Sequence, residues 1–247
     1  MSSNKISAGS YDLNTWLYGG YEKDIITTVY GPAGSGKTNF CMIAAVSQAK
    51  KEKKVIFIDT EGGFSVDRFK QICQDKKDSD YEQLIKNILI MKPTTFSDQK
   101  KIFESLYREI NNDSNIGLIV IDSMTMLYRI EIGDANEEKN DFKIKIINKE
   151  LAKQLSILSS IARNKNIPIL VTNQIYYSFV HNNSDSPKEK EAKMVGGDLL
   201  RYWSKCLIEL ELSNSKRTAI LRKHRSLPEK TLSFIISNEG IKKKGWI

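Results

Sequence analysis

Short apolar runs alternate along the chain with longer stretches in which apolar residues recur every three or four positions. Runs of roughly four to eight apolar residues are typical of buried strands, and the longer periodicity is typical of helices that cover a sheet. The pattern therefore predicts an α/β fold in which a mostly parallel central sheet is flanked by helices. The predicted strands are Ile25–Val29, Val55–Asp59, Ile88–Met91, Leu118–Asp122, Ile169–Thr172, Cys206–Leu212, Thr218–Arg222 and Leu232–Ile236.

Three predicted helices separate the earlier strands, namely Phe40–Lys50, Ser97–Asn111 and Phe142–Asn164. The last three strands follow one another too closely for helical crossovers, so we expect them to form an antiparallel edge. The chain contains no internal repeat and no low-complexity linker. We therefore expect residues 1–247 to form one domain, with residues 1–24 as a lead-in segment.

Composition and charge narrow the range of functions. The 247 residues include no apolar run long enough to span a bilayer and no signal-peptide pattern, so we expect a cytoplasmic protein without membrane contact. The three cysteines are far apart and indicate neither a disulfide framework nor a zinc site. The net charge of +8 favours a polyanionic partner such as nucleic acid. A lysine-rich but ordinary solvated surface is the alternative.

The strongest chemical signal is a glycine-rich segment between the first predicted strand and the first predicted helix. Glycines let successive backbone N–H groups converge on phosphate oxygens, and the helix N-terminus adds its positive dipole end. In such a loop the lysine reaches the β- and γ-phosphates and the hydroxyl that follows it binds Mg²⁺. The segment therefore predicts a site for ATP and Mg²⁺ built from Gly31, Pro32, Ala33, Gly34, Ser35, Gly36, Lys37, Thr38 and Asn39.

Two predicted strands end in carboxylates that can complete such a site. Asp122 ends an apolar run at the carboxyl edge of the sheet, where a carboxylate orders the water shell of Mg²⁺. An Asx turn after the strand is the alternative. Glu61 ends the next strand after the glycine-rich loop, where it can orient the water that attacks the γ-phosphate. Asp59 is the rival residue on that strand, and a solvated acidic turn is the other alternative.

In their order and spacing these blocks resemble the RecA/RadA recombinase superfamily, from about Leu13 to the end of the chain and most closely its short archaeal paralogues. The resemblance implies that Glu61 is the catalytic carboxylate and that Arg68 packs on the adenine ring. It also implies that Gln174, in Val171-Thr172-Asn173-Gln174, senses the γ-phosphate and relays the nucleotide state to a DNA-binding loop. Taken alone, Arg68 is a helix-surface charge and Gln174 a polar strand end.

Residues 175–195 are too polar and irregular for a packed element, so we interpret them as a mobile, DNA-binding loop. Aromatic residues followed by lysines suit single-stranded nucleic acid, although Tyr176 and Tyr177 can equally pack into the core. The stretch from Gly196 to Lys205 looks like the end of that loop, and its Trp-Ser-Lys portion is specifically like the short paralogues. The aromatic, histidine and lysine residues concerned are Tyr176, Tyr177, Phe179, His181, Lys188, Lys190 and Lys193.

A late basic segment completes the resemblance. Leu221–Pro228 is similar to the segment that caps the nucleotide of a neighbouring subunit. This similarity implies that Lys223 and Arg225 bind phosphate in trans, which would tie ATP use to oligomer formation. A basic edge that discourages strand pairing is the alternative.

Departures from the family limit the expected activity. Only 30 residues precede the phosphate loop, so we expect no separate N-terminal DNA-binding domain. The first phenylalanine is Phe40, so we expect no Phe-x-x-Ala docking segment before the core, which puts long filaments formed by that route in doubt. The counterpart of the family's first DNA-binding loop, Arg129–Asp141, is acidic and would bind phosphate weakly.

We therefore expect an ATP- and DNA-binding protein of homologous recombination and repair, with weak DNA-dependent ATP hydrolysis. It would act on the nucleoid as an accessory or regulator of the main recombinase. The expected partners are single-stranded DNA, a RadA-type recombinase and, in a dimer or short oligomer, further copies of the chain; double-stranded DNA remains open. A filament-forming strand-exchange enzyme and a signalling or scaffold ATPase without a DNA role are the two alternatives.

Overall fold

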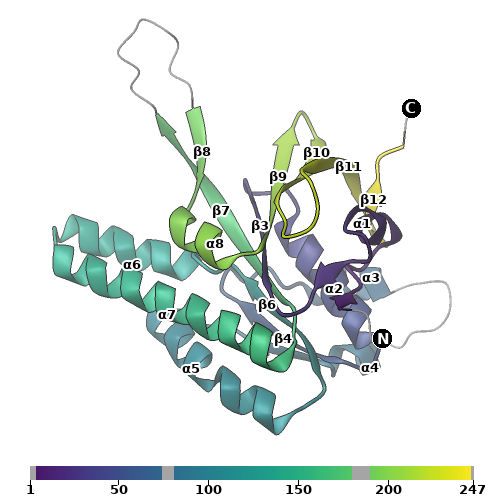
Figure 1. Ribbon diagram of the computed structural model, residues 1–247, viewed down its shortest axis with the longest axis horizontal. Coiled ribbons are helices and arrows are strands. Elements are labelled where there is room, and N and C mark those ends of the chain that lie inside the picture. Colours follow the sequence, from purple (N-terminus) through teal and green to yellow (C-terminus); the bar gives the residue numbers. More distant parts are fainter. Residues whose placement is uncertain (1–3, 74–80, 180–189, 246–247) are drawn as a thin grey trace, which may run out of the picture.

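A ten-stranded sheet forms the centre of the computed structural model, which describes residues 4–73, 81–179 and 190–245 (Figure 1). The strand order is β12-β11-β10-β9-β3-β7-β6-β4-β5, and β8 pairs with β7 alone. Pairing is parallel from β9 through β3 to β5 and antiparallel from β9 to β12. This arrangement confirms the predicted fold class. The strands are β3 (Ile26–Gly31), β4 (Lys54–Asp59), β5 (Ile88–Met91), β6 (Ile116–Asp122), β7 (Ile169–Phe179), β8 (Lys190–Met194), β9 (Cys206–Ser213), β10 (Lys216–Lys223), β11 (Lys230–Ser237) and β12 (Gly240–Lys243).

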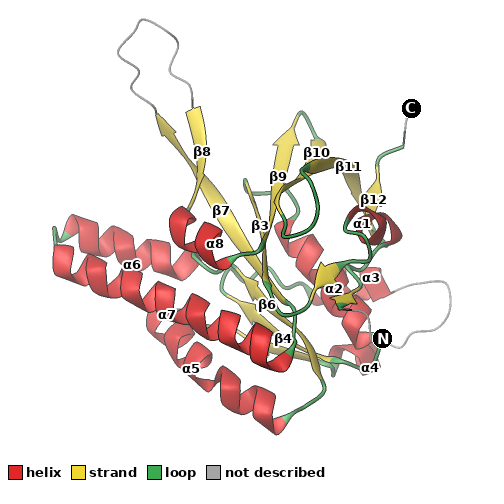
Figure 2. Ribbon diagram, in the orientation of Figure 1, coloured by secondary structure: helices red, strands yellow, loops and turns green. Residues whose placement is uncertain are grey.

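Helices cover both faces of this sheet (Figure 2). In β6, Leu118 and Val120 pack on one side with α2 and α3, whereas Ile119 and Ile121 pack on the other side with α5, α6 and α7. Burial on both faces explains why the central strands are continuous apolar runs in the sequence. The helices are α1 (Tyr11–Trp16), α2 (Lys37–Ala49), α3 (Val66–Cys73), α4 (Tyr81–Ile85), α5 (Phe96–Asn112), α6 (Met126–Glu137), α7 (Asp141–Lys165) and α8 (Gly197–Trp203).

The residues before β3 form a small unit of their own. Strands β1 (Lys5–Ile6) and β2 (Tyr21–Glu22) pair antiparallel, and α1 lies between them in the sequence. Leu13 and Leu17 of this unit are buried in the core on the α2 side of the sheet. Among the described residues, no helix is both long and apolar enough to cross a membrane.

One expectation about the segment 175–195 is wrong. Residues 175–179 extend β7 and pair antiparallel with β8, from Ile175 opposite Met194 to Phe179 opposite Lys190. The two strands project beyond the sheet as an arm (Figure 1). At the base of the arm, Ile175 packs against a small apolar cluster of Tyr30, Met194 and Leu207. Backbone pairing of the two strands continues outward from there, and such pairing needs no apolar side-chain pattern. Residues 180–189, with His181 and Lys188, and the side chains of residues 177–192, lie outside the described part; the predicted mobility remains a prediction.

The acidic segment Arg129–Asp141 is also not a loop. Helix α6 continues to Glu137, and α7 begins at Asp141 with the Asn140 side chain accepting a hydrogen bond from the Lys143 backbone N–H. The two helices pack together as a long hairpin. The acidic side chains therefore lie on a helical surface.

Candidate nucleotide-binding site

The predicted phosphate loop joins the end of β3 to the start of α2. Gly36 stands at the N-cap of α2 with a φ of 109°, a left-handed conformation that favours glycine. Because a glycine cap has no side chain to accept hydrogen bonds, the first N–H groups of α2 are available to an anion. A cavity of about 540 Å³ lies at this point, lined by Ala33, Gly34, Gly36, Lys37, Thr38, Asn39, Glu61, Gln174, Arg217 and Ile236.

The Lys37 ammonium is held inside this loop. Its Nζ donates hydrogen bonds to the carbonyl oxygens of Gly31 at 3.0 Å and Pro32 at 2.9 Å. Burial lowers the pKa of Lys37, while the nearby carboxylates Glu61 and Asp122 act in the opposite direction. An ammonium has three donors, so one remains for a phosphate oxygen after the two carbonyl contacts.

Thr38 and Asp122 present oxygens to the same small space. Asp122 is buried; one carboxylate oxygen accepts a hydrogen bond from the Thr172 hydroxyl, and the other, Oδ2, is buried without a hydrogen-bond partner among the described residues. A Cβ placed on Gly63 would lie 3.4 Å from Thr38 Oγ1 and 3.7 Å from Asp122 Oδ2. Burial raises the pKa of Asp122, and the hydroxyls of Thr172 and Thr38 oppose that shift. Since hydroxyl and carboxylate oxygens are the donors that Mg²⁺ prefers, this pair fits the predicted metal site.

Glu61 and Gln174 meet across the sheet edge although 113 positions separate them in the sequence. Gln174 Nε2 donates a hydrogen bond of 2.9 Å to Glu61 Oε1. The rival carboxylate is already engaged, because Asp59 accepts hydrogen bonds of 3.0 Å from the backbone N–H groups of both Gly63 and Phe64. Asp59 therefore holds the turn in place, and Glu61 is the carboxylate that faces the cavity.

Arg68 lies beside the start of α2. Its guanidinium donates to Asn39 Oδ1 at 2.9 Å and to the backbone oxygens of Ser237 at 2.8 Å and Asn238 at 3.2 Å. Partial burial lowers its pKa. The side chain thus ties the turn between β11 and β12 to a residue of the cavity, and its predicted contact with adenine remains a prediction.

Lys223 and Arg225 do not line the cavity of their own chain. Lys223 Nζ donates to the backbone oxygens of Arg201 at 2.7 Å and Ser204 at 2.8 Å, where α8 ends. Arg225 forms ion pairs of 2.6 Å with Glu22 and 2.9 Å with Asp24. To bind the nucleotide of a neighbouring subunit, as predicted, both side chains would have to leave these contacts.

Sequence reasoning assigned neither Ile236 nor the one missed charged residue, Arg217, to this cavity. In the sequence Arg217 is one more cation just before the expected strand Thr218–Arg222, and no motif marks it. In the structure β10 brings Arg217 to the phosphate loop, where Nη2 donates to the Gly34 carbonyl oxygen at 3.4 Å. Only the packing of the C-terminal strands against the loop reveals this contact.

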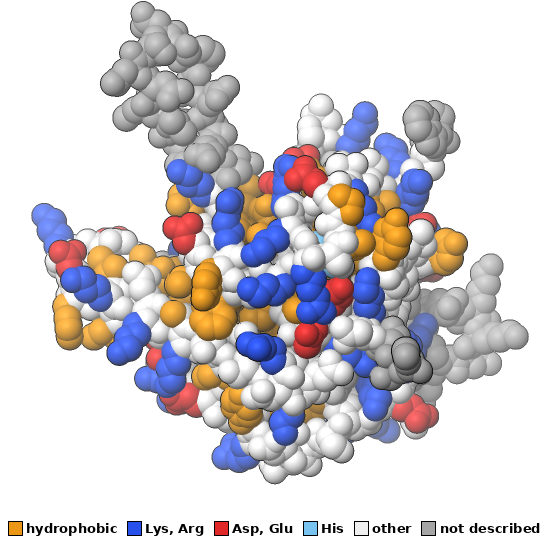
Figure 3. Space-filling view, in the orientation of Figure 1, with side chains coloured by type: hydrophobic (Ala, Val, Ile, Leu, Met, Phe, Trp, Pro, Cys, Tyr) orange, Lys and Arg blue, Asp and Glu red, His pale blue; other side chains and the backbone are white. Residues whose placement is uncertain are grey.

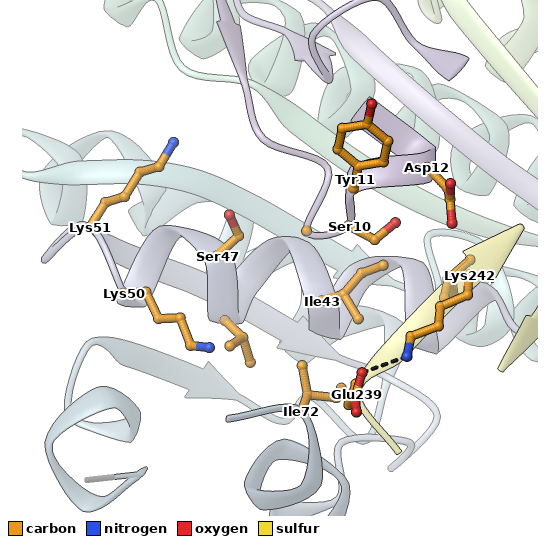
Figure 4. Close-up of a pocket in the computed structure, with 13 residues that line it drawn as sticks. Ser10, Tyr11, Asp12, Ile43, Ser47, Lys50, Lys51, Ile72, Glu239 and Lys242 are labelled. Atoms are coloured by element: carbon orange, nitrogen blue, oxygen red, sulfur yellow. Dashed lines mark hydrogen bonds and ion pairs between the residues drawn. The ribbon is translucent and has the colours of Figure 1, made fainter. Parts of the chain in front are cut away.

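A second cavity, of about 560 Å³, lies along the C-terminal half of α2 between α1 and β12 (Figure 4). One of its lysines, Lys50, lies at the C-terminal end of α2, where the helix dipole disfavours a bound anion. Another, Lys242, already forms an ion pair of 2.5 Å with Glu239. Helix α1 begins beside this cavity, but the Ser10 side chain already caps that helix by accepting a hydrogen bond from the Leu13 N–H, and the lining has no glycine-rich loop. The phosphate-loop cavity is therefore the candidate nucleotide site.

Comparison with known proteins agrees with this geometry. A family model described as Rad51 matches residues 2–244. "DNA repair and recombination protein RadB" of Methanobrevibacter smithii is 40% identical over 245 residues, covering 97% of this chain and 96% of the relative. The protein of the same name from Methanocaldococcus jannaschii is 40% identical over 225 residues, covering 91% and 96%. A crystal structure of the RadB recombinase matches with a TM-score of 0.75 and 30% identity, covering 97% of this chain and 100% of the other. The predicted resemblance is confirmed, and this chain belongs to the Rad51 family of RecA-type proteins, as do the archaeal RadB proteins that it matches.

Proposed function

We propose that this chain is an ATP- and DNA-binding protein of homologous recombination and DNA repair that assists or regulates a main RadA-type recombinase. One observation carries the proposal: a single cavity joins Lys37, Thr38 and the Glu61–Gln174 pair, and the buried carboxylate of Asp122 lies directly behind Thr38. Membership of the Rad51 family and the names of the RadB relatives support the role in recombination. The whole chain would work as one ATPase domain on the nucleoid.

Phosphate binding rests on the N-terminus of α2 and on Lys37. The free N–H groups of the helix and the remaining donor of the Lys37 ammonium converge on the space in front of the loop. Thr38 and Asp122 would hold Mg²⁺, which when bound neutralises charge on the phosphates. The buried, unpartnered oxygen of Asp122 gains a charged partner in that arrangement, which compensates for its burial.

ATP hydrolysis would depend on Glu61. A carboxylate there accepts a proton from the attacking water, and the Gln174 amide holds the carboxylate in position. Turnover by a single chain would be weak, because no neighbouring subunit supplies its Lys223 and Arg225, and the chain's own Lys223 and Arg225 do not line its nucleotide cavity.

Gln174 also lies at the base of the β7–β8 arm. The backbone N–H of Val195 donates to the Gln174 carbonyl oxygen at 3.2 Å, and the Asn173 amide donates to the Val195 carbonyl oxygen at 2.8 Å. These bonds fix the two strands of the arm to the residue that meets Glu61. A change at Gln174 on nucleotide binding would therefore reach the arm directly.

DNA binding would use the surface beside this arm. Tyr202 is 71% exposed at the end of α8, its ring lies 5.4 Å from that of Trp203, and the Lys205 ammonium lies 6.0 Å from its centre. Tyr176, on the arm, is 42% exposed. Lys and Arg side chains gather near the centre of the same face (Figure 3). Exposed rings among cations are the chemistry that stacks bases and follows a single-strand backbone.

The test is binding of a labelled single-stranded oligonucleotide, with a duplex of equal length beside it, with and without Mg·ATP across a salt series. We expect single-strand affinity that falls with salt on a log–log line and changes with ATP. Tyr202→Ala should weaken binding about 5- to 100-fold, whereas Tyr11→Ala, which removes an even more exposed tyrosine from α1, should not. Strongly cooperative coating of long oligonucleotides would favour the filament-forming alternative, and no binding at low salt in either nucleotide state would favour the scaffold ATPase.

A further inference from the structure

Arg217 is the cation of the nucleotide cavity that no motif assigns. It lies near the start of β10, opposite Leu212 of β9 and Phe234 of β11, and its side chain reaches the phosphate loop. A guanidinium carries five N–H donors. Here Nη2 makes one long contact of 3.4 Å with the Gly34 carbonyl oxygen, and Nε is buried without a hydrogen-bond partner among the described residues.

The position of Arg217 is set by close packing. The C-terminal strands form a wall against the phosphate loop: a Cβ on Gly36 would lie 2.9 Å from Ile236 Cδ1, and one on Gly34 would lie 3.8 Å from Leu212 Cδ2. A Cβ on Gly31 would lie 2.3 Å from the Leu210 carbonyl oxygen. The backbone that carries Arg217 is therefore held against the phosphate loop. The guanidinium lines the cavity directly from this fixed strand position.

Neighbouring arginines pair with carboxylates, whereas Arg217 has no such partner among the residues that the structure describes. Arg222, further along β10, pairs with Glu209 at 2.6 Å and with Glu229 at 3.0 Å. Arg225 pairs with Glu22 and Asp24. Within the described part of the chain, no ion pair involves Arg217, although its guanidinium is partly buried. A buried N–H donor without an acceptor destabilises the fold. An anion bound next to this guanidinium would compensate for that cost.

We propose that Arg217 is a phosphate-binding residue of the nucleotide site, supplied by the C-terminal sheet of the same chain. The inference rests on the proposed ATP site and adds a ligand to it. When a nucleoside triphosphate is bound, the guanidinium donates charge-assisted hydrogen bonds to phosphate oxygens from the end that already reaches the loop. A single chain thus holds the triphosphate with two of its own cations, Lys37 and Arg217, before any neighbouring subunit contributes.

The test is the dissociation constant for ATP, measured by calorimetry with Mg²⁺ for the full chain and its variants. Arg217→Ala should weaken ATP binding about 10- to 100-fold, because charge-assisted bonds are lost. Arg217→Lys should recover part of that loss, since it keeps the charge without the planar fork. The matched control is Lys216→Ala, which removes the same charge from the adjacent position on the other face of β10, where the side chain lines a different cavity; its affinity should stay within about twofold of the unmodified chain.

The outcomes separate this inference from the proposed function. If the unmodified chain binds ATP and Lys37→Ala does not, but Arg217→Ala binds within twofold of the unmodified chain, Arg217 is not a ligand and the ATP site stands. If the unmodified chain does not bind ATP, both proposals fail. Melting temperatures without nucleotide show whether each variant is folded. Should Arg217→Ala not fold, Arg217→Gln decides by the same affinity criterion, since it keeps a side chain of similar reach without the charge.

Discussion

Replacing the Glu61 carboxylate with an amide, Glu61→Gln, should separate ATP binding from ATP hydrolysis. Glu61 is exposed on the cavity side of its turn, and its described side-chain contact is the 2.9 Å hydrogen bond from Gln174. Glutamine keeps the length of the side chain and an amide oxygen that can still accept this bond. What it loses is the ability to take a proton from water.

The expected size of the effect follows from these contacts. General-base catalysis contributes about 10²- to 10⁴-fold in rate. Its loss therefore raises the barrier by about 3 to 5 kcal/mol. The free energy of unfolding should change by less than about 0.5 kcal/mol, because the position is exposed and the Gln174 bond survives. ATP affinity should remain close to that of the unmodified chain.

Phosphate release at saturating Mg·ATP, with single-stranded DNA present, measures the rate, and calorimetry measures ATP affinity. Asp59→Asn is the matched control, because it makes the same chemical change on the same strand end. An amide has one acceptor oxygen, so the N–H of Gly63 or Phe64 loses its partner. That loss should cost about 1 to 3 kcal/mol of stability and lower the melting temperature.

The two variants should therefore differ in kind: one is folded and inactive, and the other is destabilised. If Glu61→Gln hydrolyses ATP within twofold of the unmodified chain, Glu61 is not the general base. Asp59 would then be the next candidate for the general base, despite its two backbone hydrogen bonds.

Four further changes test separate parts of the structure. Lys37→Ala should abolish ATP binding in calorimetry because it removes the loop's buried cation; undiminished binding would remove the basis of the nucleotide site. Asp122→Asn should raise the Mg²⁺ concentration needed for half-maximal hydrolysis at least about tenfold, and an unchanged Mg²⁺ requirement would argue against the metal role. Gly31→Ala should destabilise the fold by about 1 to 3 kcal/mol in denaturant unfolding, because the new Cβ meets the Leu210 carbonyl oxygen; an unshifted midpoint would contradict the close approach of β9. Burial lowers the pKa of His224 from its ordinary 6.5, so the unfolded chain takes up a proton more readily and stability should decline as pH falls below about 6.5. His224→Gln should flatten that part of the pH profile, and an equal slope in both proteins would exclude this histidine as the cause.

The sequence was sufficient wherever the physical signal is local. The phosphate loop is a contiguous segment, so its glycines, Lys37 and Thr38 could be assigned roles directly from their order. The central strand β6 is a continuous apolar run, and the ends of β3, β4 and β6 lie within two residues of the predicted ones. The central strand β7 instead continues well past its predicted end at Thr172, into the arm. The carboxyl ends of parallel strands share one edge, which correctly suggested that Glu61 and Asp122 lie near the loop.

The β7–β8 arm shows where pattern reading fails. Its strands pair through backbone hydrogen bonds such as the one from the Val195 N–H to the Gln174 carbonyl oxygen, and the arm extends away from the core. Its described apolar contacts are confined to the base, where Ile175 and Met194 pack with Tyr30 and Leu207, and so short a stretch gives no alternation that a sequence pattern can detect. The acidic hairpin of α6 and α7 was misjudged for a related reason, since the resemblance to a family loop was given more weight than local helix signals.

Only the tertiary structure decided which distant residues meet. The turn after β4 decides whether Asp59 or Glu61 faces the cavity. There the Asp59 carboxylate accepts hydrogen bonds from two backbone N–H groups, which leaves Glu61 to face the cavity. Arg217 lies 183 positions from Gly34 and reaches it because β9 pairs with β3 and brings β10 and β11 against the phosphate loop. Sequence periodicity records whether a residue is buried, but it does not record which partner buries it. The local motif therefore determined the chemistry of this site, and the order of strands in the sheet determined which further side chains take part in it.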